Sequence, residues 1–162
     1  MWETLCHYSL VGKVEIEIEV KAPAAKFHQV FSCKPHIMAS MSPQSIQGCD
    51  LLEGEWGKPG CIICWRYSHD GSPQIAKEII EAIDNENYIT NYKVIGGNLL
   101  ELYKSFSSTV KVTPKENDDG SLVHWIFEYE KLKEDVPDPT GKLQILIDVA
   151  KDIDAHLLSQ QP

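Results

Sequence analysis

Two cysteines, Cys61 and Cys64, have the C-x-x-C spacing that redox centres and zinc sites use. Both chemistries need the two sulfur atoms to converge, normally at a helix start or in a zinc knuckle. This pair falls in residues 61–69, which are predicted to form a strand, and strand positions three apart point to opposite faces. No second pair with this spacing occurs, and the six histidines are scattered. We therefore expect two unrelated buried thiols, no metal site and no cofactor.

Lys104 is the polar residue with the clearest potential for acid–base chemistry. In the alternating segment 100–113 it shares parity with Phe106 and Ser108, on the face predicted to point inward. A lysine there is either an edge residue whose ammonium reaches solvent or an amine inside a cavity, where burial readily removes its charge. Glu78 and Asp154 are further candidates for a polar spot. No Ser–His–acid or Cys–His arrangement supports nucleophilic catalysis.

The composition describes an ordinary globular chain. It has 162 residues, enough for one domain, with 43% hydrophobic residues, 24% charged residues and a net charge of −9. Arg66 is the single arginine, so binding to nucleic acid or stable association with an anionic membrane is not expected. No apolar run approaches the roughly 20 residues that span a bilayer, and residues 1–8 lack the features of a secretory signal. Five cysteines, an odd count, favour free thiols and a cytoplasmic location.

The hydrophobic periodicity predicts the elements that must position these side chains. Residues 14–20 alternate strictly between Val or Ile and Glu, which is typical of a half-buried strand. Two short helices are expected at 24–31 and 34–41, and a long amphipathic helix at 139–158. Between them six strands are expected at 45–52, 61–69, 74–83, 88–95, 100–113 and 122–132. We predict an α+β fold, a seven-stranded antiparallel sheet curled around the long C-terminal helix.

Three of these strands carry aromatic residues on the face predicted to point inward. The faces consist of Ile63, Trp65 and Tyr67; Tyr88, Thr90, Tyr92 and Val94; and Val123, Trp125, Phe127 and Tyr129. Such faces could fill a solid core. Alternatively, they could line a pocket in which phenol and indole groups orient an apolar ligand.

Motifs along the chain resemble those of plant major latex proteins, which belong to the Bet v I superfamily. They include Ser9-Leu10-Val11-Gly12-Lys13, Phe31-Ser32-Cys33-Lys34-Pro35-His36, Ile46-Gln47-Gly48-Cys49-Asp50-Leu51, Leu102-Tyr103-Lys104-Ser105-Phe106 and Lys151-Asp152-Ile153-Asp154-Ala155-His156-Leu157. The resemblance covers about residues 9–158. It implies one domain over these residues, a helix-grip fold and an internal hydrophobic cavity, which leaves residues 1–8 as a leader without an assigned role and 159–162 as a tail.

The glycine-rich loop at residues 54–60 departs from a phosphate-binding pattern. Trp56 and Pro59 replace flexible residues, and Pro59 removes one of the N–H groups that a phosphate cradle needs. Nucleotide binding is not expected at this loop. The net charge and the single arginine also argue against the ribonuclease activity claimed for pathogenesis-related members of the superfamily.

The resemblance favours the pocket over the solid core. Residues expected to contact a small hydrophobic ligand are Phe27, Phe31, Ile63, Trp65, Tyr67, Ile79, Thr90, Tyr92, Phe106, Ser108, Trp125, Phe127, Leu143, Ile147, Ala150 and Asp154. The first hypothesis is a carrier of plant metabolites, hormone-like compounds or lipids, linked to defence or stress and monomeric by default. The alternative is a cofactor-independent cyclase, isomerase or condensing enzyme, with Lys104 or Glu78 moving a proton. Ligands are expected to enter between the second short helix and the strand hairpins.

Overall fold

The computed structural model describes residues 10–160, so the expected leader at residues 1–8 lies outside the described part of the chain. The chain begins with strand β1 (Val11–Val20), followed by helix α1 (Ala24–Ser32), the 3-10 turn η2 (Pro35–Ile37) and the short helix α2 (Met38–Met41). Six strands follow: β2 (Ile46–Glu53), β3 (Ile62–His69), β4 (Ser72–Asp84), β5 (Ile89–Gly97), β6 (Tyr103–Pro114) and β7 (Ser121–Lys131). Two further 3-10 turns, η3 (Asn98–Glu101) and η4 (Pro139–Lys142), precede β6 and the long helix α3 (Leu143–Ser159).

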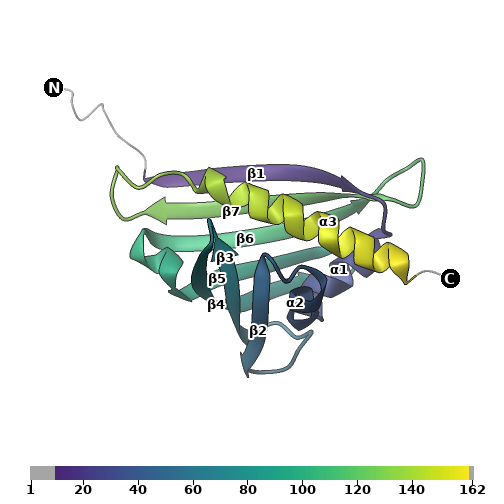
Figure 1. Ribbon diagram of the computed structural model, residues 1–162, viewed down its shortest axis with the longest axis horizontal. Helices are drawn as coiled ribbons and strands as arrows, with labels where there is room; N and C mark the ends of the chain where they lie inside the picture. The colour runs from purple at the N-terminus through teal and green to yellow at the C-terminus, as the bar shows by residue number, and fades with distance from the viewer. Residues whose placement is uncertain (1–9, 161–162) are drawn as a thin grey trace.

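The seven strands form one antiparallel sheet in the order β1-β7-β6-β5-β4-β3-β2. Figure 1 shows α3 lying across one face of this sheet, while β2 and β3 run steeply to β1 and β7. The sheet therefore curls toward the helix, as its right-handed twist favours. The predicted fold class is confirmed.

The inner face of the sheet follows the alternation of the sequence. On β1 the glutamates are exposed while Ile16 and Ile18 are half-buried, and Ile16 lies opposite the buried Trp125 of β7. On β7 the residues Val123, Trp125, Phe127 and Tyr129 are all buried. Period-two patterning fixes which side chains face the core, since a slip by one residue would expose all of them.

A β-bulge at Lys104 interrupts this alternation on β6. Tyr103 pairs with Lys131 and Ser105 pairs with Glu130, so Lys104 has no partner of its own across the ladder. The extra residue lets Tyr103 and Phe106, three positions apart, both face the core. The Lys104 side chain is 69% exposed, and its Nζ lies 3.7 Å from Oε2 of Glu130. The prediction that Lys104 faces inward is wrong, because the bulge breaks the alternation between Lys104 and Phe106.

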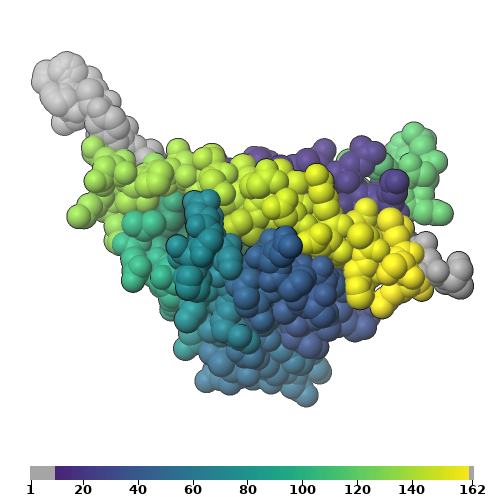
Figure 2. All heavy atoms as spheres, in the orientation of Figure 1, coloured from purple at the N-terminus to yellow at the C-terminus, as the bar shows by residue number. Residues whose placement is uncertain are grey.

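Helices α1, α2 and α3 cover the inner face of the sheet. Phe27 and Phe31 of α1 stack with ring centroids 5.6 Å apart, and Phe31 meets Trp125 edge-on at 5.1 Å. Figure 2 shows α3 as a band across this side of the molecule, with the segment that includes α2 packed below it. A hydrogen bond of 2.6 Å from the Ser42 hydroxyl to Asp152 ties the end of α2 to α3. Among residues 10–160 no helix combines the length and the apolar character needed to cross a bilayer.

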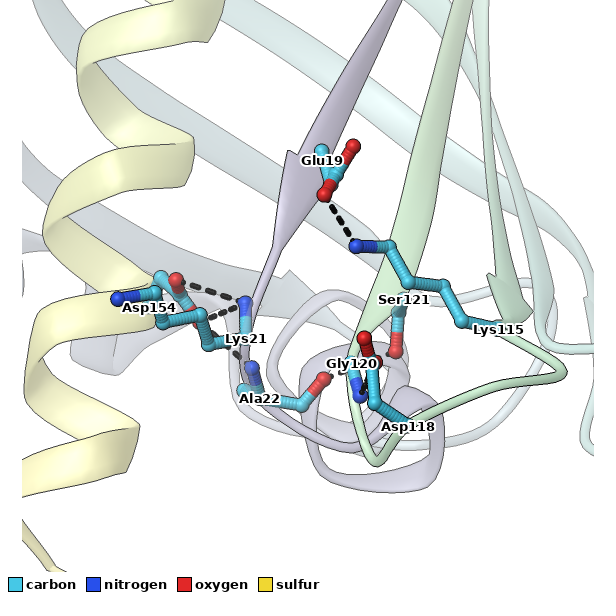
Figure 3. A network of polar contacts seen from close by, with 8 residues as sticks. All are labelled: Glu19, Lys21, Ala22, Lys115, Asp118, Gly120, Ser121 and Asp154. Atoms are coloured by element: carbon cyan, nitrogen blue, oxygen red, sulfur yellow. Dashed lines mark hydrogen bonds and ion pairs between the residues drawn. The ribbon is translucent and has the colours of Figure 1, made fainter.

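A polar network joins α3 to the corner between β1 and α1 (Figure 3). The Asp154 carboxylate accepts hydrogen bonds from the backbone N–H groups of Lys21 at 3.0 Å and Ala22 at 2.8 Å. The Ser121 hydroxyl donates to the carbonyl of Ala22 at 2.8 Å, which ties the start of β7 to the same corner. Asp154 therefore joins α3 to this corner, and Ser121 joins β7 to it. The prediction that it forms a polar spot in the cavity is wrong, because its oxygens face the backbone of this corner.

Candidate functional site

A cavity of about 140 Å³ lies between the inner face of the sheet and the helices. Nine residues predicted from the sequence lie on its wall: Phe31, Trp65, Tyr67, Glu78, Tyr92, Phe106, Ser108, Trp125 and Phe127. They come from one helix and five strands, and the curl of the sheet brings them together. Strand parity predicts the inward direction of those that lie on strands, wherever the alternation is regular.

Other predicted residues lie away from this wall. Phe27, Ile63, Thr90 and Ala150 are fully or almost fully buried in the packed core. Ile79 alternates with Glu78 and Ile80, so it lies on the outer face of β4 and cannot share the cavity with Glu78. Leu143, Ile147, Lys104 and Asp154 are also absent from the cavity wall.

Sequence reasoning missed eight residues of the wall: Met38, Ile46, Ala76, Leu99, Lys142, Ile145, Leu146 and Val149. On α3 the cavity face runs through Leu146 and Val149, whereas the prediction chose Ile147 and Ala150, one position further along the helix. Apolar residues occur at all four positions, so periodicity alone did not fix the rotation of the helix. Ala76 could have been found, since it shares the parity of Glu78 on β4.

Glu78 is the acidic residue of the cavity wall. The Trp65 indole N–H donates to its Oε1 at 2.6 Å, from the neighbouring strand. Burial raises the pKa of Glu78 to about 7, against the smaller lowering effect of the Trp65 hydrogen bond. The group can therefore exist in both protonation states near neutral pH, as a general acid or base requires.

Two tyrosines, Tyr67 and Tyr92, also line the cavity. Burial raises the pKa of Tyr67 to about 12, and the negative charge of Glu78 adds to this effect. The pKa of Tyr92 is raised well above its usual value, mainly by burial, and its hydroxyl donates to the Phe31 carbonyl at 2.6 Å. Tyr92 therefore fastens α1 to the sheet, whereas the described residues provide no hydrogen bond to the Tyr67 hydroxyl.

Lys142 is the basic residue of the cavity wall, placed by the turn η4 immediately before α3. Its Nζ lies 3.3 Å from Nδ1 of His69 at the end of β3, and 5.9 Å from the centre of the Tyr67 ring. Burial lowers the pKa of Lys142, while the charge of Asp70 partly opposes the shift. Lys142 therefore has the place of a cavity amine, one of the two alternatives considered for Lys104.

The cysteines do not form a second site in the described structure. Cys33, Cys49, Cys61 and Cys64 are free thiols, and burial is the main cause that raises the pKa of Cys61. Among residues 10–160, no three His, Cys, Asp or Glu side chains gather in an arrangement that could hold a metal ion.

Comparison with known proteins identifies the family of this chain. Residues 9–160 match the model of the pathogenesis-related protein Bet v 1 family. The chain is 47% identical to MLP-like protein 43 of Arabidopsis thaliana over 94% of its own length and 97% of that protein. It is 50% identical to MLP-like protein 28 of the same plant over 94% of its own length, but spans only 46% of that relative.

Solved structures agree with these relatives. The crystal structure of ginseng major latex-like protein 151 from Panax ginseng has a TM-score of 0.88 and 44% identity, covering 92% of this chain and 99% of that one. A norcoclaurine synthase from Thalictrum flavum, solved with dopamine and hydroxybenzaldehyde, has a TM-score of 0.72 at 19% identity, covering 95% of this chain and 90% of that one. At this identity the likeness concerns the fold alone. The chain belongs to the Bet v 1 family, and its relatives there are major latex-like proteins.

Proposed function

We propose that this chain is a carrier that binds small, largely apolar molecules in the cavity beneath α3. The observation that carries the proposal is the wall itself: among the described residues that line it, Glu78 and Lys142 alone are charged, and the others are aromatic, aliphatic or small. Such a wall excludes water from apolar ligands and leaves a few polar groups to orient them. Binding of small hydrophobic ligands by Bet v 1 family members supports the same function.

The setting of this function is part of the proposal. We place the carrier in the cytoplasm as a monomer, with a role in plant defence or specialised metabolism. The acidic net charge of −9 would keep a loaded carrier soluble. It also disfavours nucleic acids and anionic membranes as partners.

Titration with the neutral dye N-phenyl-1-naphthylamine tests ligand binding, with competition by flavonoids and sterols. The variant Ala76→Phe places a ring in the cavity and is expected to weaken dye binding at least tenfold. Ile79→Phe adds a ring to the outer face of the same strand and should leave binding unchanged. The proposed carrier function is wrong if folded wild-type protein binds no dye, or if the two variants bind the dye equally well.

An enzymatic function in the same cavity is the second candidate, because Glu78 has a pKa of about 7 beside the Tyr67 phenol. Glu78 would move a proton while the phenol stabilises an oxyanion, as a cyclase, isomerase or condensing enzyme requires. The exposed position of Lys104 removes it from this role. Turnover of a reactive carbonyl compound that is abolished in Glu78→Gln, with dye binding retained, would support this candidate.

A further inference from the structure

We propose that the cavity selects small carboxylic acids that carry a hydroxyl group at the opposite end, with the carboxylate at Lys142 and the hydroxyl at Glu78. This inference rests on the proposed carrier function and names the class of ligand. Single-ring phenolic acids are the simplest molecules of this class.

The first support is the ammonium group of Lys142, which touches no carboxylate among residues 10–160. Four other lysines lie within 4 Å of a carboxylate at the surface: Lys13, Lys104, Lys115 and Lys131. Among residues 10–160 no carboxylate lies within that distance of Lys142 Nζ, which contacts Nδ1 of His69 at 3.3 Å. The Asp70 carboxylate lies 3.6 Å from Nε2 of the same ring, so its charge acts on Lys142 from further away. A partly buried cation gains most from a counter-ion, and a ligand carboxylate can reach this one from inside the cavity.

The second support is the free side of the Glu78 carboxyl group. Its Oε1 accepts from Trp65, whereas no described residue donates a hydrogen bond to Oε2. Glu78 is on the cavity wall, so a hydroxyl of a ligand in the cavity is a candidate donor to Oε2. The ionised group repels a second carboxylate and accepts a hydrogen bond from a hydroxyl. The two ends of the cavity therefore favour opposite ends of a ligand.

The third support is the distance over which these two groups act. Lys142 Nζ lies 5.9 Å from the centre of the Tyr67 ring. The sheet register places Glu78 opposite Ile63, four residues before Tyr67 on the same face of β3, and its carboxyl is bonded to Trp65, two residues before Tyr67. Two to four residues along one strand face span about 7–13 Å, a length that a phenol ring with a short carboxylate chain can bridge. The cavity volume of about 140 Å³ is close to that of a cavity of about 150 Å³ known to hold benzene. Its aromatic walls, which include Phe106 and Trp125, suit a ring between the two polar ends.

Competition against N-phenyl-1-naphthylamine at about pH 8 tests this inference with three matched probes. They are 3-(4-hydroxyphenyl)propionate, its neutral primary amide, and 3-phenylpropionate, which lacks the hydroxyl. The hydroxy acid is expected to bind at least tenfold more tightly than either of the other two, because each of them leaves one polar end of the cavity unpaired. Circular dichroism checks that every variant is folded.

Variants then test which residue binds the carboxylate of the ligand and which binds its hydroxyl. Lys142→Met and Lys142→Gln should remove the preference for acid over amide while retaining the preference for the hydroxyl. Glu78→Gln should reduce the preference for the hydroxyl and retain that for the acid. Lys104→Met, which changes an exposed lysine, should behave as wild type.

The outcomes separate this inference from the carrier function. If the dye binds but the amide displaces it as well as the acid does, the proposed carrier function is retained and the proposed preference for hydroxy acids is wrong. Retention of the acid preference in both folded Lys142 variants also overturns it. If folded wild-type protein binds neither dye nor probes, the carrier function and the ligand class both fail.

Discussion

Glu78 is a carboxyl group that folding makes harder to ionise. Its unfolded pKa of 4.5 rises to about 7 in the folded protein, mainly through burial. The folded state therefore binds more protons between these values, and stability decreases as the pH rises from about 4.5 to about 7. The full shift corresponds to roughly 3 kcal/mol. Glu78→Gln should be more stable than wild type by up to that amount at pH 8, and about equal to it at pH 4.

Urea unfolding at both pH values measures this difference. Glu81→Gln is the matched control, because Glu81 is an exposed residue of the same strand and should show no such pH-dependent gain. If Glu78→Gln destabilises the protein equally at both pH values, the buried carboxyl is not a source of instability at high pH.

Residue positions were predictable where one local rule applied without interruption. Trp65, Tyr67, Trp125 and Phe127 face inward because their strands alternate regularly, and the sequence shows that alternation directly. Lys104 was misplaced because a bulge depends on the pairing of two strands, which a single segment does not reveal. Lys142 was missed for a similar reason, since only the folded turn η4 brings it to the cavity.

At the scale of elements, Asp154 joins α3 to the corner between β1 and α1 through hydrogen bonds to Lys21 and Ala22 (Figure 3). Hydrogen bonds to a charged group contribute about 1.5–3 kcal/mol each, and less where solvent reaches them, as it does at Lys21. We expect Asp154→Ala to lower the free energy of unfolding by about 2 kcal/mol. Asp154→Asn should have a smaller effect, since its amide retains one acceptor oxygen.

Chemical denaturation of the two variants measures this contribution. Asp148→Ala is the control, because Asp148 is exposed on the same helix and bonds to Gln144 within it. A loss for Asp154→Ala no larger than that for Asp148→Ala would show that the corner is held by apolar packing alone.

Element order was predicted more completely than element orientation. All seven strands and the long helix were expected from period and turn signals, and the curled sheet around α3 confirms the predicted class. The face of α3 that lines the cavity was not predicted correctly. The helix has two adjacent apolar stripes, one through Leu146 and Val149 and the other through Ile147 and Ala150. Packing against the sheet chooses between such stripes, and that contact is formed only in the tertiary structure.

At the scale of the whole molecule, the elements that enclose the cavity differ in how easily they open. The sheet contributes walls joined by long ladders of backbone hydrogen bonds. On the opposite side Met38 belongs to α2, a helix of only four residues, and Lys142 meets His69 near the turn between β3 and β4. Short helices and hairpin turns open locally at lower free energy than the centre of a sheet. Entry between α2 and the strand hairpins remains the prediction of this arrangement.

Hydrogen exchange with and without N-phenyl-1-naphthylamine tests that route. We expect the dye to slow exchange most in residues 35–42 and 69–72, because these segments open to admit it and close over it once bound. Ser42→Ala removes the hydrogen bond from the end of α2 to Asp152, so it should speed exchange in 35–42 and raise both the association and dissociation rates of the dye. Residues 121–131 of β7 should change little in either experiment. Protection that appears mainly in β7, or in the 115–120 loop at its start, would place the entrance elsewhere on the molecule.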